Sequence, residues 1–207
     1  MKKSNFEISG VFPIPIFHTY LERELTNEEL TFAKNQINDA NDNVGNNTSK
    51  NNYILEHEKM KDIKSFIEEG IQIYMDNVVC PGDDTQVYIT QSWINYTEEN
   101  QFHHQHAHPN SILSGVLYIS CNKENDAIKF TNINEYQQIK PKINNFNIWN
   151  SDTWCFPIER GQLIMFPSST KHEVETKKDN NTRISLAFNT FYKGNIGSNI
   201  DLTELKL

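Results

Sequence analysis

His-His-Gln-His-Ala-His-Pro-Asn-Ser, residues 103–111, runs directly into Ile-Leu-Ser-Gly-Val-Leu-Tyr-Ile at 112–119. Four of the seven histidines lie within the six residues 103–108. Alternate side chains of a β-strand leave the same face, so a strand here would place His106 and His108 side by side. Neutral imidazoles on one face can share a metal ion. The stretch therefore predicts a strand that carries part of a metal site.

The sequence pattern on both sides of this stretch is typical of a β protein. Short β-type runs separated by polar, turn-rich segments are found at 87–96, 103–108, 112–120, 127–130, 162–166, 171–176 and 182–192. No helical pattern interrupts them. Such an order predicts a sandwich or jelly roll that closes over a small interior.

The first part of the chain is different and is expected to support this β region. Residues 27–38 and 59–78 have helical periodicity, and the first of these segments follows a capping box from Thr26 to Glu29. The proline-containing segment 6–17 is predicted to be an extended edge strand. The polar segment 38–52 is predicted to be a mobile loop, because it has little apolar surface to bury.

Length and composition favour a single folded domain. The 207 residues are enough for one core, and 11% aromatic residues exclude a disordered chain. We expect one domain, 1–207, with an N-terminal strand and helices at 1–86, a β core at 87–192 and a C-terminal tail at 193–207.

Charge and cysteine content limit the location and the partners. The net charge of −8 disfavours nucleic acid and anionic membranes. Neither a signal peptide nor a membrane span is apparent, and three widely spaced cysteines fit reduced thiols, so a cytoplasmic protein is expected. The expected partner is a small-molecule or peptide substrate, and the N-terminal segment is compatible with a homodimer edge.

A metal site needs a further ligand, which a jelly roll can supply from a distant strand. His172 is the candidate, because it follows an apolar run and a Pro-Ser turn and opens the next strand. An isolated histidine near a turn can equally lie on the surface.

Residues 183–189 alternate strictly between polar and apolar side chains, with Arg183, Ser185 and Asn189 on one face. If that face points into the barrel, a buried Arg183 needs an anion, and a carboxylate with Ser185 as second donor is the natural ligand. The alternative is an arginine that faces solvent from an edge strand.

With these residues in place, the chain resembles the iron(II)- and 2-oxoglutarate-dependent oxygenases over about residues 90–192. The likeness is to a small branch with the pattern His-X-His-Pro-Asn-Ser…Ser-Gly-Val-X-Tyr, many of whose members are uncharacterised and some of which come from phages. It implies a mainly β fold, a cupin-like jelly roll called the double-stranded β-helix, with the two helices as buttresses. It also implies that His106 and His172 bind iron, and that Arg183 and Ser185 bind the distal carboxylate of 2-oxoglutarate.

The chain departs from the family pattern at His108, which stands where the family has Asp or Glu. Imidazole suits iron, but the exchange leaves the site one charge unit more positive. The predicted metal ligands are His106, His108 and His172, with His104 as the alternative to His108. His103 is expected on the opposite face, as polar surface.

Three more residues complete the predicted cofactor-binding set: Tyr118, Asn95 and Asn110. Tyr118 is also compatible with ordinary core packing, and Asn110 with a turn. The long segment 131–160, which contains Trp149 and Trp154, is either a lid that selects the substrate or an insertion that covers a sheet edge.

The predicted function is a non-haem Fe(II)- and 2-oxoglutarate-dependent dioxygenase. It would use Fe(II), 2-oxoglutarate and O2 to hydroxylate a substrate, such as a peptidyl or free amino acid, with release of succinate and CO2. No catalytic residue is expected beyond the metal ligands. Two alternatives remain: a cupin-type three-histidine metalloenzyme that does not use 2-oxoglutarate, and a non-catalytic, metal-stabilised β-sandwich binding module.

Overall fold

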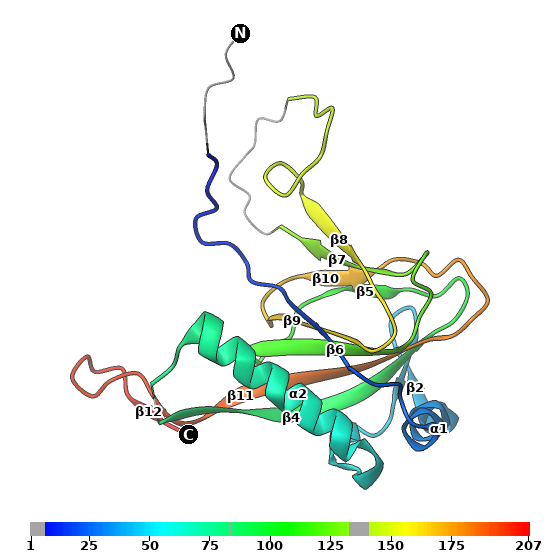
Figure 1. The fold of residues 1–207 in the computed structure, drawn as a ribbon, viewed down its shortest axis with the longest axis horizontal. Helices are drawn as coiled ribbons and strands as arrows, with labels where there is room; N and C mark the ends of the chain where they lie inside the picture. The colour runs from blue at the N-terminus through cyan, green and yellow to red at the C-terminus, as the bar shows by residue number, and fades with distance from the viewer. Residues whose placement is uncertain (1–6, 83, 133–140) are drawn as a thin grey trace.

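The computed structural model describes residues 7–82, 84–132 and 141–207, which form two antiparallel sheets and a helical layer (Figure 1). The larger sheet has the order β1 (Phe17–Tyr20), β9 (Gln162–Pro167), β6 (Leu113–Ser120), β11 (Arg183–Ile196), β4 (Thr85–Thr97), β3 (Asn47–Ser49) and β2 (Ala40–Asp42), with β12 (Leu205–Lys206) paired to β11. The smaller sheet has the order β5 (His103–His106), β10 (His172–Val174), β7 (Ala127–Thr131) and β8 (Thr153–Pro157). The predicted mainly β jelly roll is confirmed.

The helices cover one face of the larger sheet. α1 (Asn27–Asn35) has the predicted capping box between Thr26 and Glu29. It continues as a 3-10 turn, η1 (Gln36–Asp39), and two more such turns, η2 (Ile54–Glu56) and η3 (Glu58–Met60), lead into α2 (Lys61–Tyr74). α2 lies along the sheet and ends in a π turn, η4 (Met75–Val79) (Figure 1).

Two apolar clusters hold the layers together. The first joins the helices to the larger sheet and includes the α2 residues Ile63 and Ile67 and the β11 residues Leu186 and Phe188. The second lies between the two sheets, where side chains of β6 and β9 meet those of β7. The alternation predicted along 183–189 therefore separates a helix-facing, apolar side of β11 from a side that faces the smaller sheet.

Gly115 on β6 lies where the strand packs closely against core side chains. A β-carbon at this position would collide with the ring of Phe188 and would lie 2.8 Å from the Met165 side chain. The glycine of the Ser-Gly-Val stretch is thus required by close packing against β11 and β9.

Two N-terminal expectations are wrong. Segment 38–52 is no simple loop, because β2 and β3 form a hairpin that pairs with β4. Polar contacts, rather than apolar packing, hold this hairpin in place. The hydroxyl of Ser49 accepts a hydrogen bond from the Ile94 N–H at 3.0 Å, and Asn46 is buried. Within 6–17, the described residues 7–16 form no strand, and the edge strand β1 begins at Phe17.

The cysteines agree with the prediction of reduced thiols. The three cysteines, Cys80, Cys121 and Cys155, are free thiols. None of the helices in the described ranges has both the length and the apolar character needed to cross a membrane.

Candidate metal centre

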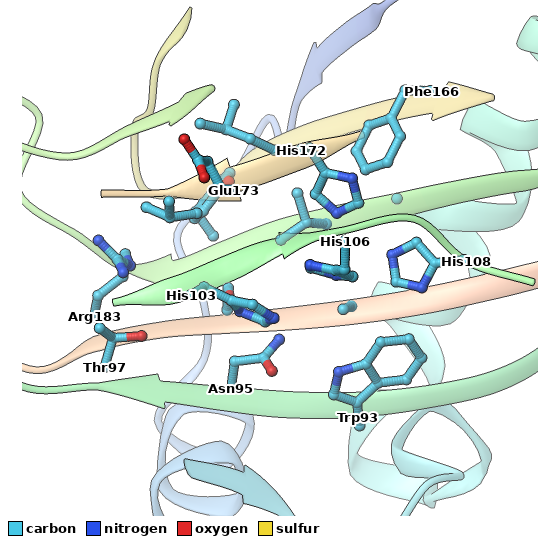
Figure 2. Close-up of a pocket in the computed structure, with 17 residues that line it drawn as sticks. Trp93, Asn95, Thr97, His103, His106, His108, Phe166, His172, Glu173 and Arg183 are labelled. Atoms are coloured by element: carbon cyan, nitrogen blue, oxygen red, sulfur yellow. The ribbon is translucent and has the colours of Figure 1, made fainter. Parts of the chain in front are cut away.

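Three histidines from two parts of the chain meet between the sheets. The ring nitrogens available for coordination in His106, His108 and His172 all lie within 4.8 Å of one another. His106 and His172 are direct partners across the antiparallel pair of β5 and β10. His108 follows two residues after the end of β5, where its backbone N–H donates to the Ser168 carbonyl at 2.9 Å. Figure 2 shows the three rings converging.

Backbone carbonyls fix the orientation of two of these rings. Nδ1 of His106 lies 2.8 Å from the carbonyl oxygen of His104, and Nδ1 of His172 lies 3.0 Å from that of Thr170. A carbonyl oxygen only accepts, so each Nδ1 carries the proton. The lone pair of each ring is then on Nε2, the arrangement that a histidine ligand of a metal requires.

The electrostatic environment keeps the three imidazoles neutral. Burial lowers the pKa of His172 to about 3 and that of His108 to about 4, and the charge of His106 adds to both effects. Burial also lowers the pKa of His106. Neutral rings near pH 7 are available to a metal ion without first losing a proton.

His104, the alternative metal ligand, is close to His103 and His106. A second group, His103, His104 and His106, also has ring nitrogens within 4.8 Å of one another. It shares His106 with the first group, and His106 has one free ring nitrogen, so a single ion could use one group or the other. The alternative set of His104, His106 and His172 does not come together among the described residues.

The expectation that His103 faces away from the site is wrong. Its ring is stacked on that of His106, with centroids 4.7 Å apart, and it lines the same pocket (Figure 2). The cause is an irregularity in pairing: His106 lies opposite His172, whereas His103 lies opposite Val174. His104 and Gln105 of β5 thus lie opposite the single residue Glu173 of β10, and this bulge turns His103 to the face that carries His106.

The pocket extends from the histidines along β4 and β11, where paired residues form successive levels. Trp93 lies opposite Ala187 beside the histidines, Asn95 opposite Ser185 in the middle, and Thr97 opposite Arg183 at the far end. Tyr118 of β6 lines the middle level, opposite Ser185. The structure thus brings Arg183, Ser185, Tyr118 and Asn95 to one pocket with the predicted metal ligands.

Arg183 is buried, and its guanidinium is only partly satisfied. Nη1 donates to Oδ1 of Asp126 at 2.7 Å, and the ammonium of Lys177 lies 3.6 Å from Oδ2 of the same carboxylate. Nη2 of Arg183 is buried and has no hydrogen-bond partner in the described part of the chain, and the same holds for Oδ1 of Asn95. Buried polar atoms without partners are rare in folded proteins, so these two indicate a missing ligand in the pocket.

Asn110 is not brought to the pocket, and this part of the predicted set is corrected. It is exposed and has a backbone φ of +55°, in the turn that reverses the chain between β5 and β6. Asparagine tolerates this left-handed conformation better than most residues, which accounts for its presence there.

Segment 131–160 is only partly described, since 133–140 lie outside the described residues. Its last part forms β8, which pairs with β7 and so covers an edge of the smaller sheet. None of its described residues lines the pocket at the histidines. The edge-covering interpretation holds for β8, and a lid remains a prediction.

Comparison with known proteins finds a family model that matches part of the chain. Residues 91–189 match the model of a family described as "Putative 2OG-Fe(II) oxygenase", where 2OG is 2-oxoglutarate. The resemblance to the 2OG-Fe(II) oxygenases is confirmed. Fe(II), 2-oxoglutarate and O2, predicted from the sequence, are the cofactor and cosubstrates of this family. No curated protein matches the chain by sequence.

Solved structures of 2OG-Fe(II) oxygenases have the same fold. A 2OG-Fe(II) oxygenase family oxidoreductase from Burkholderia pseudomallei aligns with 84% of this chain and 83% of its own, at 14% identity and a TM-score of 0.53. A prolyl-4-hydroxylase from Pseudomonas putida aligns with 85% and 92%, at 12% identity and 0.52. The epimerase SnoN from nogalamycin biosynthesis, in complex with Fe3+, α-ketoglutarate and nogalamycin RO, aligns with 87% and 81%, at 11% identity and 0.63. At these identities the likeness is one of fold.

Sequence reasoning missed several residues that contact the side chains of the pocket. Asp126 precedes an ordinary short strand, and its partner Arg183 is 57 positions away. Asn46 lies in the segment taken for a loop. The bulge that turns His103 inward leaves no trace in the amino-acid pattern.

Proposed function

We propose that this protein is an Fe(II)- and 2-oxoglutarate-dependent dioxygenase that hydroxylates its substrate and releases succinate and CO2. The observation that carries the proposal is the unpartnered Nη2 of buried Arg183, at the opposite end of the pocket from His106, His108 and His172. Arg183 at one end of the pocket would bind the distal carboxylate of 2-oxoglutarate, and a metal ion held by the histidines at the other end would bind its 2-oxo acid group. Figure 2 shows Arg183 and the histidines at these two ends.

The three histidines would hold the iron. Nε2 of His106 and of His172 is free to coordinate, because each Nδ1–H is occupied by a carbonyl. When bound, the metal supplies the position at which O2 and the 2-oxo acid group react. The protein contributes ring positions set by β5, β10 and the segment after β5, and aromatic side chains, Phe166 and Trp93, that line the pocket beside the histidines.

The charges of the site favour a dianionic cosubstrate. Three neutral imidazoles leave the charge of a divalent ion uncompensated, whereas a carboxylate ligand would reduce it by one unit. Arg183 is already paired with Asp126, so a cosubstrate carboxylate would be bound by Nη2 and by the hydroxyl of Ser185.

The surroundings of the metal group favour an uncharged substrate. A second hollow shares His103, His106 and His108 with the pocket and opens beside Trp93. Its remaining described lining consists of amides, a hydroxyl and an imidazole: Asn43, Thr48, Asn52, Gln91, Asn189 and His104. Since none of these side chains is a carboxylate, ammonium or guanidinium, a peptidyl side chain fits the hollow better than a free, zwitterionic amino acid.

Anaerobic titration tests the proposal. Adding Fe(II) and then 2-oxoglutarate should produce a metal-to-ligand charge-transfer band, and admitting O2 should yield succinate. Arg183→Met, which cannot bind a carboxylate, should bind Fe(II) normally and lose roughly tenfold to a hundredfold in 2-oxoglutarate affinity. Fe(II) binding with no band in the wild-type protein, and no effect of Arg183→Met, would leave the cupin-type metalloenzyme or the binding module as the function.

A further inference from the structure

His103 lines the pocket but is not one of the three proposed metal ligands. The one candidate metal group among the described residues that contains His103 also needs His106, so it competes with the proposed group. It is stacked on His106, with ring centroids 4.7 Å apart. A buried neutral imidazole has one nitrogen that donates and one that accepts. Its role in the pocket therefore depends on which nitrogen carries the proton.

Hydrogen bonds from two asparagines of the β2–β3 hairpin determine which nitrogen of His103 carries the proton. Nδ2 of Asn43 donates to Oδ1 of Asn46 at 2.9 Å. The amide oxygen of Asn46 is thus fixed toward Asn43, and its Nδ2 points to the site. That Nδ2 lies 3.3 Å from Nδ1 of His103 and 3.5 Å from the hydroxyl oxygen of Thr97. An amide nitrogen only donates, so Nδ1 of His103 accepts and its proton is on Nε2.

This tautomer has two consequences for the pocket. An Nε2 that carries a proton has no lone pair for a metal ion, so the competing group of His103, His104 and His106 is disfavoured relative to the group with His172. The same N–H becomes a hydrogen-bond donor inside the pocket. It joins the unpartnered Nη2 of Arg183 and the hydroxyls of Ser185 and Thr97, which line the same space.

The unpartnered Nη2 of Arg183 and the Nε2–H of His103 are donors that call for a ligand with acceptor atoms. We propose that His103 is a cosubstrate-binding residue, whose Nε2–H donates to the carboxylate that Arg183 binds, in the tautomer imposed by Asn46. This inference rests on the proposed function for the identity of the carboxylate. It assigns a role to the β2–β3 hairpin, which lies outside the matched residues 91–189.

The tautomer can be measured without metal or cosubstrate. Nitrogen-15 NMR of the metal-free protein distinguishes the two neutral forms of histidine, with His103→Gln used to assign the signal. We expect the Nε2–H form for His103. Observation of the Nδ1–H form would overturn the inference, whatever the enzyme turns over.

The binding role is tested by anaerobic titration of the Fe(II) protein. His103→Leu removes the donor and should weaken 2-oxoglutarate binding roughly tenfold to a hundredfold. His103→Gln, whose amide nitrogen reaches the position of Nε2, should recover much of this loss. The affinity for 2-oxobutyrate, which has no distal carboxylate, should be the same in all three proteins. His57→Leu, at a histidine that lines neither the pocket nor the second hollow, is the control and should leave the 2-oxoglutarate affinity unchanged.

Asn46→Asp tests the tautomer with almost no change of shape. A carboxylate at this position accepts from Nδ1–H of His103 and so removes the proton from Nε2. We expect the NMR signal of the Nδ1–H form together with a loss of 2-oxoglutarate affinity similar to that of His103→Leu. If the tautomer changes and the affinity does not, His103 is not a cosubstrate ligand.

The outcomes separate this inference from the proposed function. If the wild-type protein gives no charge-transfer band, the proposed function fails and the role of His103 fails with it, even with the expected tautomer. If the band forms and His103→Leu leaves the affinity unchanged, only the inference fails. If His103→Leu abolishes Fe(II) binding, His103 is a metal ligand and the inference is wrong.

Discussion

Arg183 and Asp126 are paired at 2.7 Å although both side chains are almost fully buried. The carboxylate of Asp126 is also shared by Lys177, whose ammonium is 3.6 Å away, and by the backbone N–H of Asn122 at 2.8 Å. Asp126 thus holds the guanidinium by Nη1 and leaves Nη2 to the pocket. The pair is both a structural unit and a positioning device for the proposed anion site.

Loss of the Asp126 charge should strongly destabilise the fold. Asp126→Asn keeps the shape of the side chain but leaves the buried Arg183 without its counter-ion, whereas Lys177 keeps Asp179 as a partner. The free energy of unfolding should therefore fall by about 3–5 kcal/mol. Urea denaturation of the metal-free protein measures this change. Glu175→Gln is the control, since Glu175 pairs with Lys129 at a side-chain exposure of 67% and its loss should cost less than about 1 kcal/mol. Equal effects of the two substitutions would contradict the proposed role of Asp126.

Restoring a carboxylate at position 108 should shift the balance between metal and cosubstrate. His108→Asp reduces the positive charge of the loaded site by one unit, so Fe(II) should be held more tightly and the dianionic 2-oxoglutarate more weakly. Competition with a chelator measures the first effect, and anaerobic titration measures the second. His108→Asn, which is neutral, is the control for shape. A simultaneous gain or a simultaneous loss of both affinities would contradict the charge argument.

The parts of the site that follow from local pattern could be predicted from the sequence. Strict alternation along 183–189 gave the two faces of β11, and the spacing of His106 and His108, together with the position of His172 after its turn, gave the metal group. The two faces of β11 follow from the period of a strand alone, because β11 is regular over those residues and pairs with β4 without a shift. The histidine group also rests on the family resemblance, since His108 lies past the end of β5.

The parts that were missed depend on tertiary structure. His103 turns inward because of a bulge between β5 and β10, and Asp126 matters because of a partner far along the chain. The β2–β3 hairpin was missed because it is stabilised by polar contacts, such as those of Asn46 and Ser49, that have no hydrophobic periodicity. Single-sequence reasoning cannot detect pairings of this kind, since either partner alone looks like ordinary polar surface.

Gly115 should tolerate no side chain while Phe188 is present. Gly115→Ala places a methyl group against the Phe188 ring in a closely packed core, and we expect a loss of about 1–3 kcal/mol in the free energy of unfolding. Thermal and urea denaturation measure the loss. Gly82 has open space around its α-carbon, so Gly82→Ala is the matched control with little effect. In the double variant Gly115→Ala with Phe188→Leu, the alanine should cost less than it does alone. A purely additive result would show that the cost arises elsewhere.

The metal-free protein should lose stability as the pH falls below about 6.5. Burial lowers the pKa of His172 to about 3 and that of His108 to about 4, whereas each returns to about 6.5 in the unfolded chain. Between these values the unfolded chain binds protons that the folded chain does not, so acid favours unfolding. Urea denaturation from about pH 7 to about pH 5 measures the effect in a range above the titration of ordinary carboxylates. His172→Gln should reduce the slope by about one proton, or about 1.4 kcal/mol per pH unit. A stability that stays constant or rises over this range would show that the histidines are protonated in the folded protein and are poor metal ligands near pH 6.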